Sequence, residues 1–267
     1  MIEHNKIYCG NHLKILKDVD NKSIDLTLTS PPYDNLRTYN GYEFQFEKLA
    51  NELLRVTKKG GVIVWVVGDA TINGSETGTS FKQALYFKEI GFNLHDTMVY
   101  LKKDFPPLTH NRYEQQFEYM FVFSKGKPKT FNRLREPSKY AGELRNKKNN
   151  KHEVRSAIRN REGYTTIQDT KLRTNVWLMA VAHTKHNHPA IFPEKLARDH
   201  IISWSNKGDL ILDPMNGSGT TTKVAELLER NFIGIDISQE YCNIANERLQ
   251  KETIFKNPIV PHLEKPE

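Results

Sequence analysis

The chain has 267 residues, 37% hydrophobic and 27% charged, with a formal net charge of +7, and this length can bury the core of a full domain. No apolar run of about 18 residues occurs, which excludes a membrane-spanning helix, and the N-terminal residues lack the apolar segment of a secretory signal. We therefore expect a cytoplasmic protein, and its excess of positive charge is compatible with a polyanionic partner.

The first elements predict a strand, a helix and a second strand. An apolar strand at Lys6–Gly10 precedes a helix at His12–Lys17, which Asn11 can cap. Leu26–Thr29 reads as a buried strand that stops at Pro31-Pro32, because neither proline can donate a hydrogen bond to a sheet. Ligands bind at such strand ends in open α/β sheets.

The same alternation continues along the chain. Apolar residues at helical spacing predict a helix at Glu43–Thr57, and Lys58-Lys59-Gly60-Gly61 is typical of a helix end. Val62–Val67 is an unbroken apolar strand, as expected for a strand covered on both faces. A loop rich in Gly, Ser and Thr at Asp69–Thr79 then leads to a helix at Ser80–Ile90.

Two further strands complete the first half of the chain. Asn93–Leu101 and Phe117–Phe123 are apolar, and we expect them to form an antiparallel pair. The order of elements up to this point is typical of an α/β protein with a doubly wound, mostly parallel sheet that finishes in a hairpin.

A basic block follows, with little hydrophobic periodicity. Residues 125–173 contain 15 Lys and Arg against 5 acidic residues, an excess larger than the net charge of the whole chain. A nearly neutral scaffold carrying one basic block is typical of a protein that binds a phosphate backbone. The block is either a small recognition subdomain or partly disordered. The candidate residues for contact with a phosphate backbone are Arg133, Arg135, Lys139, Arg145, Lys147, Lys148, Arg155, Arg159 and Arg161.

The alternation of strands and helices resumes after the basic block. Pro193 opens a helix that runs to about Ser203, since proline is tolerated in a first turn. Asp209–Asp213 is an apolar strand, and a glycine-rich turn joins it to a helix at Thr220–Glu229. A strand at Phe232–Ile237 and a helix at Gln239–Lys251 follow.

The turn after Asp213 has features of a nucleoside site. Gly217 and Gly219 let the backbone approach a ligand closely, and the next helix begins with oriented N–H groups. The following strand ends in Asp236, at the position where an acid hydrogen-bonds ribose hydroxyls in a βαβ unit. The turn matches neither the dinucleotide nor the P-loop motif. A tight structural turn is the alternative interpretation.

The stretch Ser30-Pro31-Pro32-Tyr33 has features of a site for a planar base. The prolines leave backbone carbonyls outside any sheet ladder, Ser30 adds a second acceptor and Tyr33 an aromatic face. Two acceptors on an exocyclic base amine would turn its lone pair toward an electrophilic methyl group, which is catalysis by orientation. The alternative is that the prolines merely terminate a strand.

Three motifs together resemble those of the DNA amino-methyltransferases that use S-adenosylmethionine. They are Thr29–Tyr33, His188–Pro193 and Asp213–Thr221, and their order around the basic block resembles the β group of that family. The resemblance covers nearly the whole chain and implies a Rossmann-like methyltransferase fold. Further matches in residue type and order occur at Lys58–Gly61, Glu118–Lys125 and Gly234–Asp236.

The resemblance also implies roles for individual residues. The catalytic motif would comprise Ser30, Pro31, Pro32 and Tyr33, with Tyr33 stacking on a base extruded from the duplex. Asn11 stands where the family often has Asp, and would contact the cofactor as a neutral amide. The implied cofactor-binding residues are Asn11, His188, Pro189, Ala190, Asp213, Pro214, Gly217, Gly219, Thr220 and Asp236.

The implied function is site-specific methylation of double-stranded DNA in a restriction-modification system. The domains would be a catalytic half at residues 1–125, a target-recognition region at 126–175, a cofactor-binding half at 176–255 and a tail at 256–267. Ser30 replaces the Asp that the family often has. The Ser form resembles the cytosine-N4 enzymes, so we predict cytosine N4, with adenine N6 as the alternative because some adenine enzymes share it.

Other classes of function stay open at this point. The chain would also suit a catalytically silent DNA-binding protein, or a methyltransferase that acts on RNA or a protein amide. Cys9 and Cys242 predict neither a disulfide nor a covalent thiol mechanism, and we predict no metal site. A cognate restriction endonuclease and a homodimer are open as partners.

Overall fold

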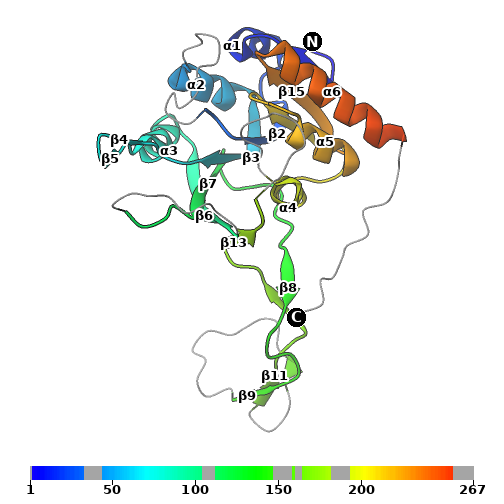
Figure 1. The fold of residues 1–267 in the computed structure, drawn as a ribbon. Coiled ribbons are helices and arrows are strands. Elements are labelled where there is room, and N and C mark those ends of the chain that lie inside the picture. Colours follow the sequence, from blue (N-terminus) through cyan, green and yellow to red (C-terminus); the bar gives the residue numbers. More distant parts are fainter. Residues whose placement is uncertain are drawn as a thin grey trace. The chain divides into compact units, whose positions relative to one another are not determined.

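The computed structural model describes residues 2–32, 44–103, 112–146, 158–159, 164–181 and 193–254 (Figure 1). The chain divides into two compact units. The first consists of Met1–Phe131 together with Val176–Glu267, and the second is Asn132–Asn175. All but the last two residues of the second unit lie within the basic block of the sequence.

An eight-stranded sheet forms the centre of the first unit. Within the described residues, β7 pairs antiparallel with β3 and β6, whereas the other neighbours in this sheet pair in parallel. The predicted doubly wound, mostly parallel sheet with an antiparallel hairpin is therefore confirmed. In spatial order the strands are β1 (Lys6–Cys9), β15 (Asn231–Asp236), β14 (Leu210–Asp213), β2 (Ile24–Thr29), β3 (Thr57–Val67), β7 (Phe117–Ser124), β6 (Asn93–Lys102) and β13 (Val176–Met179).

Helices cover both faces of the sheet. Alternate side chains of β3, such as Ile63 and Trp65, pack in one buried cluster with Leu49, Leu53 and Phe87 from α2 and α3. The helices α4, α5 and α6 pack against β2, β14 and β15. The helix bounds are α1 (His12–Ile15), α2 (Phe46–Val56), α3 (Thr79–Glu89), α4 (Glu194–Trp204), α5 (Thr220–Leu227) and α6 (Gln239–Ile254), and a 3-10 turn follows α1 at η1 (Leu16–Asp18). Within the described ranges, the helices are all too short or too polar to cross a membrane.

The expected helix end at Lys58–Gly61 is wrong. Helix α2 ends at Val56, and those residues belong to β3. Gly60 has a φ of +83° and donates its N–H to Lys125 O, while a Cβ on Gly61 would lie 3.1 Å from Asp25 O. The glycines therefore serve an irregular, closely packed strand rather than a helix end.

The expected loop at Asp69–Thr79 is also wrong in part. It contains a small hairpin of β4 (Thr71–Ile72) and β5 (Ser75–Glu76). Asn73 and Gly74 join the two strands with φ values of 50° and 77°. Positive φ at both central residues is the geometry that Asn-Gly favours in a two-residue hairpin.

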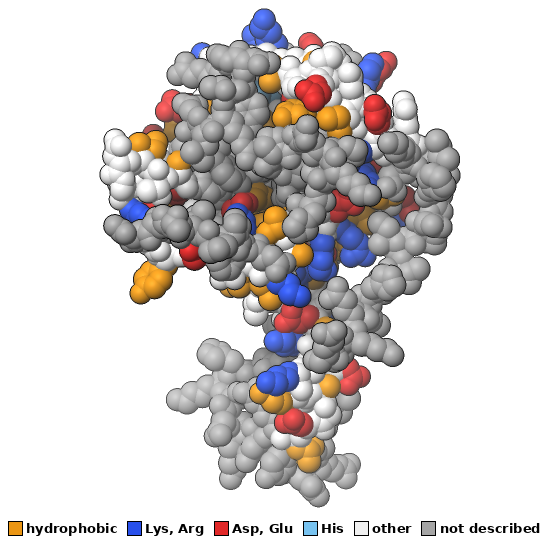
Figure 2. Space-filling model, in the orientation of Figure 1, with side chains coloured by type: hydrophobic (Ala, Val, Ile, Leu, Met, Phe, Trp, Pro, Cys, Tyr) orange, Lys and Arg blue, Asp and Glu red, His pale blue; other side chains and the backbone are white. Residues whose placement is uncertain are grey.

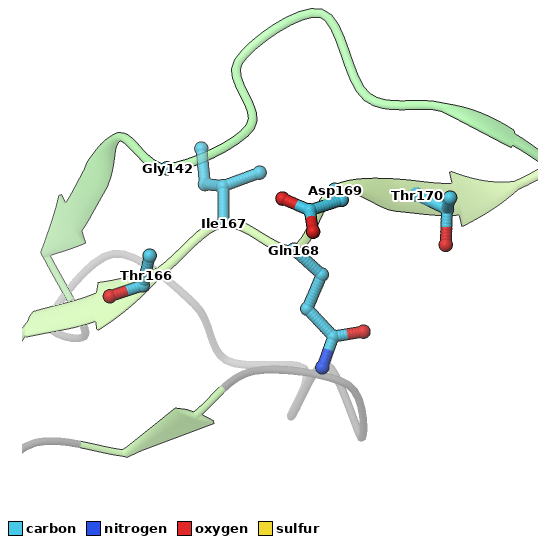
Figure 3. A pocket seen from close by; sticks show the side chains of 6 residues that line it. All are labelled: Gly142, Thr166, Ile167, Gln168, Asp169 and Thr170. Atoms are coloured by element: carbon cyan, nitrogen blue, oxygen red, sulfur yellow. The ribbon is translucent and has the colours of Figure 1, made fainter.

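The second unit consists of short antiparallel strands. One pair joins β8 (Arg135–Pro137) to β12 (Thr170–Leu172), and another group joins β9 (Leu144–Asn146), β11 (Tyr164–Thr166) and β10 (Ile158–Arg159). A cavity of about 320 Å³ lies in this unit, lined by Gly142, Thr166, Ile167, Gln168, Asp169 and Thr170 (Figure 3). The described part of the basic block is thus folded as a small β structure.

Candidate active site

The carboxyl ends of the parallel strands meet at one edge of the sheet. From β14 the chain passes through α5 to β15 on one side, and from β2 it passes through α2 to β3 on the other. The adjacent ends of β14 and β2 are therefore the topological switch point, where open α/β sheets bind ligands. Ser30 follows β2 and Pro214 follows β14, so both predicted motifs lie at this switch point.

A buried hydrogen bond joins the two motifs. Thr29 Oγ1 donates to Asp213 Oδ1 over 2.7 Å, although the residues are 184 positions apart in sequence. Thr221 Oγ1, at the start of α5, donates to Leu28 O over 3.2 Å. Thr29 therefore links the strand end that carries Ser30 to the strand end that carries the glycine turn. Sequence reasoning included Thr29 in a motif but gave it no role, because threonine is common in strands for other reasons.

Asp213 is a buried carboxyl group whose pKa is raised. Burial raises its pKa to about 6, although hydrogen bonds from Thr29, Thr221 and the Met215 N–H act in the opposite direction. The neighbouring Asp236 adds to the increase of the pKa. The folded state therefore binds a proton at this carboxyl more tightly than an ordinary aspartate would.

We expect the stabilising contribution of this protonation to disappear as the pH rises. Because the folded pKa of about 6 lies above the ordinary 3.8, the contribution is complete below about pH 4 and is lost through about pH 6. The two-unit difference corresponds to about 3 kcal/mol. In urea titrations at several pH values, wild type should lose about this free energy of unfolding relative to Asp213→Asn. A difference between the two proteins that does not change with pH would contradict the raised pKa.

Asp236 holds the glycine turn in place from the neighbouring strand. Its Oδ2 accepts the Gly217 N–H over 2.7 Å, and its Oδ1 accepts the Ser238 N–H over 2.9 Å. Burial raises the pKa of Asp236, while the backbone N–H bonds lower it. The Ile237 N–H also acts on this carboxylate, so three backbone N–H groups use its roughly four acceptor positions and leave room for one further donor, such as a ribose hydroxyl.

The first strand adds another polar group at this edge. The Gly10 N–H donates to Asp236 O over 2.8 Å, which places Asn11 beside the acid at the end of β15. Asn11 Oδ1 accepts the Leu13 N–H over 2.8 Å, so the predicted helix cap is confirmed. Asn11 Nδ2 is then a donor on the residue that follows Gly10, at the same edge of the sheet as the end of β15. A carboxylate for hydroxyls and an amide for a base fit a nucleoside-containing cofactor.

The glycines near the turn are required by packing. Gly219 caps α5 with a φ of +81°, and a Cβ there would lie 2.7 Å from Ala245 Cβ in α6. A Cβ on Gly234 in β15 would lie 2.8 Å from Thr222 Cγ2 and 2.9 Å from Asn216 Cγ. The sequence shows that a glycine is present, but not which neighbouring atom would clash with a larger side chain at that position.

Four predicted site residues lie outside the described residues, and they are Tyr33, His188, Pro189 and Ala190. The same holds for four basic candidates, which are Lys147, Lys148, Arg155 and Arg161.

The remaining basic candidates are described to different extents. For Arg145 and Arg159 the structure describes only the backbone. The Arg135 guanidinium donates to Thr170 Oγ1 and Thr170 O, and so joins β8 to β12. Lys139 Nζ lies 5.6 Å from the centre of the Tyr140 ring.

The fold and the residues at the switch point together define a class of protein. A doubly wound sheet with a Pro-Pro strand end beside a glycine-rich turn is the arrangement of a Rossmann-like methyltransferase. The chain belongs to the DNA methylase family, whose model matches residues 24–247. The resemblance inferred from the motifs is thereby confirmed.

Individual relatives agree with this assignment. The chain is 53% identical to the orphan methyltransferase M.BamHII of Bacillus amyloliquefaciens, covering 92% of this chain and 94% of that protein. It is 31% identical to the type II methyltransferase M.HpaI of Haemophilus parainfluenzae, covering 92% of this chain and 74% of that protein.

Solved structures share the fold. The cytosine-N4-specific PvuII DNA methyltransferase has a TM-score of 0.68 at 21% identity, covering 91% of this chain and 85% of that chain. M1.HpyAVI in complex with SAM has a TM-score of 0.61 at 25% identity, covering 91% and 99%.

Proposed function

We propose that this DNA amino-methyltransferase modifies the exocyclic amine of a base flipped out of a specific duplex site, with cytosine N4 favoured over adenine N6. The hydrogen bond between Thr29 and Asp213 carries the proposal, because it holds the Pro-Pro strand end against the glycine-turn strand end. A base amine at the first and a methyl donor at the second would then lie within reach of each other. We further propose that the enzyme belongs to a restriction-modification system.

S-Adenosylmethionine is the cofactor and supplies an electrophilic methyl group. Asp236 would accept hydrogen bonds from its ribose hydroxyls, and Asn11 would contact its adenine. The turn at Gly217–Gly219 would lie alongside, with its N–H groups oriented by Asp236 and by the strand ends. In this way the chain holds the donor in place and leaves the reacting bond free.

Ser30 and the carbonyl beside the prolines would bind the target amine. The amine of a base is a weak nucleophile because its lone pair is delocalised into the ring. Two acceptors on its hydrogens favour a tetrahedral nitrogen whose lone pair faces the methyl group. The N–CH₃ bond would form as the sulfur–methyl bond of the donor breaks, with the neutral thioether S-adenosylhomocysteine as the leaving group. The N–H proton would pass along one of these hydrogen bonds to water, because neither acceptor is basic enough to keep it. The Ser form of the motif supports cytosine as the target.

The second unit would bind the phosphate backbone of the duplex through the basic block. Figure 2 shows blue basic and red acidic side chains on the described part of this unit. Candidate contacts such as Arg133, Arg135 and Lys139 lie in it. Phosphate contacts would fix the register of the protein on DNA, and base contacts would supply the specificity.

We expect the purified chain to transfer labelled methyl groups from S-adenosylmethionine to unmodified duplex DNA. Amplified DNA without prior methylation is the substrate, and methylation-aware sequencing of the product gives both the base and the site. Modified cytosine N4 is the expected product, and modified adenine N6 would reverse the preference for cytosine. No incorporation into any unmodified DNA, or preferred incorporation into competing RNA, would contradict the proposed function.

A further inference from the structure

A guanidinium group on α6 forms hydrogen bonds with the glycine turn. Arg248 Nη1 donates to Ser218 O over 2.6 Å and to Ser218 Oγ over 2.9 Å. Arg248 Nη2 donates to Glu194 Oε1 over 2.8 Å, at the first residue of α4. Arg248 thus joins the turn to two helices that are far apart in sequence.

The two cations that bond Glu194 are largely buried, although Glu194 itself is 47% exposed. The side chain of Arg248 is 17% exposed, and that of Lys223, which donates to the same Glu194 oxygen over 2.9 Å, is 13% exposed. Burial alone would raise the pKa of Glu194, but the hydrogen bonds and charges of Lys223 and Arg248 outweigh it and lower this pKa. Charge-assisted bonds in a partly buried setting are stronger than exposed ones.

Arg248 supplies a restraint on the turn that the other bonds do not. The Asn216 N–H donates to Ile235 O and the Gly217 N–H donates to Asp236 Oδ2. Within the turn, the Gly219 N–H donates to Asn216 O. In addition, the carbonyl and the hydroxyl of Ser218 both accept from Arg248, which joins the middle of the turn to α6. A planar guanidinium can bond Ser218 and Glu194 at once, whereas a lysine ammonium is a single point of charge.

We propose that Arg248 is a positioning residue for the cofactor, acting through the Ser218 peptide, and that Glu194 orients Arg248 for this role. The inference depends on the proposed function of the glycine turn. Arg248 contacts neither Ser30 nor the Pro-Pro strand end in the described residues. Its loss should therefore weaken the binding of S-adenosylmethionine and leave the rate at saturating cofactor nearly unchanged.

The test measures the dissociation constant of S-adenosylmethionine by calorimetry, together with KM and kcat, for wild type, Arg248→Met, Arg248→Lys and Glu194→Gln. We expect Arg248→Met to raise Kd and KM about ten-fold with kcat within about two-fold, as for one lost charge-assisted bond. Arg248→Lys should recover part of the affinity. Glu194→Gln should weaken binding less than Arg248→Met, and the double variant should bind no worse than Arg248→Met.

The exposed pair of Lys207 and Glu229 provides a matched control. Their side chains are 68% and 67% exposed and lie 2.6 Å apart, and Lys207→Met should leave both Kd and kcat unchanged. Unchanged Kd in Arg248→Met, or a fall in kcat with Kd unchanged, would overturn the inference. If Arg248→Met does not fold, Arg248→Lys decides by the same measurements. Wild type that neither binds the cofactor nor methylates DNA would instead refute the proposed function.

Discussion

Replacing Ser30 by alanine should reduce kcat for methyl transfer by about 10²- to 10³-fold, a loss typical of removing one group aligned to the transition state. Ser30 directly follows Thr29, whose hydroxyl is held by Asp213, so the serine is attached to a fixed strand end. Its hydroxyl would accept from the target amine as the nitrogen becomes tetrahedral. Single-turnover transfer of labelled methyl to duplex DNA at saturating cofactor measures the effect.

The affinity for S-adenosylmethionine should not change in this variant, since the glycine turn and Asp236 are untouched. Ser23→Ala is a matched control at the opposite end of the same strand. The Ser23 hydroxyl donates to Asp20 O over 2.8 Å, before the first residue of β2, whereas Ser30 follows the last. Loss of the Ser23 hydroxyl should therefore leave kcat unchanged. An unchanged kcat in Ser30→Ala would contradict the role assigned to this hydroxyl.

Gly219→Ala should destabilise the first unit by about 2–4 kcal/mol, because strain and overpacking add. The φ of +81° at this position is unfavourable for a residue with a Cβ, and the new methyl would lie 2.7 Å from Ala245 Cβ. Helix α6 would have to move away from the turn, and Arg248 lies on that helix. Urea unfolding measures the stability, and we expect a parallel loss of cofactor binding.

Gly78 provides the control for backbone strain alone. It caps α3 in the same left-handed region with a φ of +64°, and a Cβ there would meet no atom within 4 Å. Gly78→Ala should therefore cost only about 1 kcal/mol. Adding Ala245→Gly to Gly219→Ala should recover part of the loss. Equal losses in the two single alanine variants would show that contact with α6 is unimportant.

The order and type of the main elements could be predicted because apolar periodicity is a local property. The residues at which helices and strands begin and end were less predictable. Lys58–Gly61 has the composition of a helix end, but Gly60 bonds Lys125 and Gly61 fits against Asp25, and both partners are distant in sequence. The hairpin at Asn73-Gly74 did have a local signal, because Asn-Gly favours a two-residue turn. The prediction of a loop considered only the composition of Asp69–Thr79 and missed this signal.

The candidate site was predictable at the level of its strand ends but not of its supporting contacts. Prolines and glycines identify where a strand stops and where a turn is tight. These residue types do not show that Thr29 forms a hydrogen bond with Asp213, or that Ala245 packs against Gly219. Arg248 has the appearance of an ordinary solvent-facing residue in a charged helix. Only the three-dimensional arrangement shows that its guanidinium binds the turn.

The sheet order also has a consequence for how the chain folds during synthesis. Strand β2 needs β14 as its neighbour, and β1 pairs with β15, whose last residue is Asp236. All of Asn132–Asn175 must therefore leave the ribosome before the first strand can pair. Until then, apolar strands of the N-terminal half present unpaired edges, and contacts between residues so distant in sequence form slowly. The nascent first half of the chain should accordingly depend on protection from aggregation until the last strand arrives.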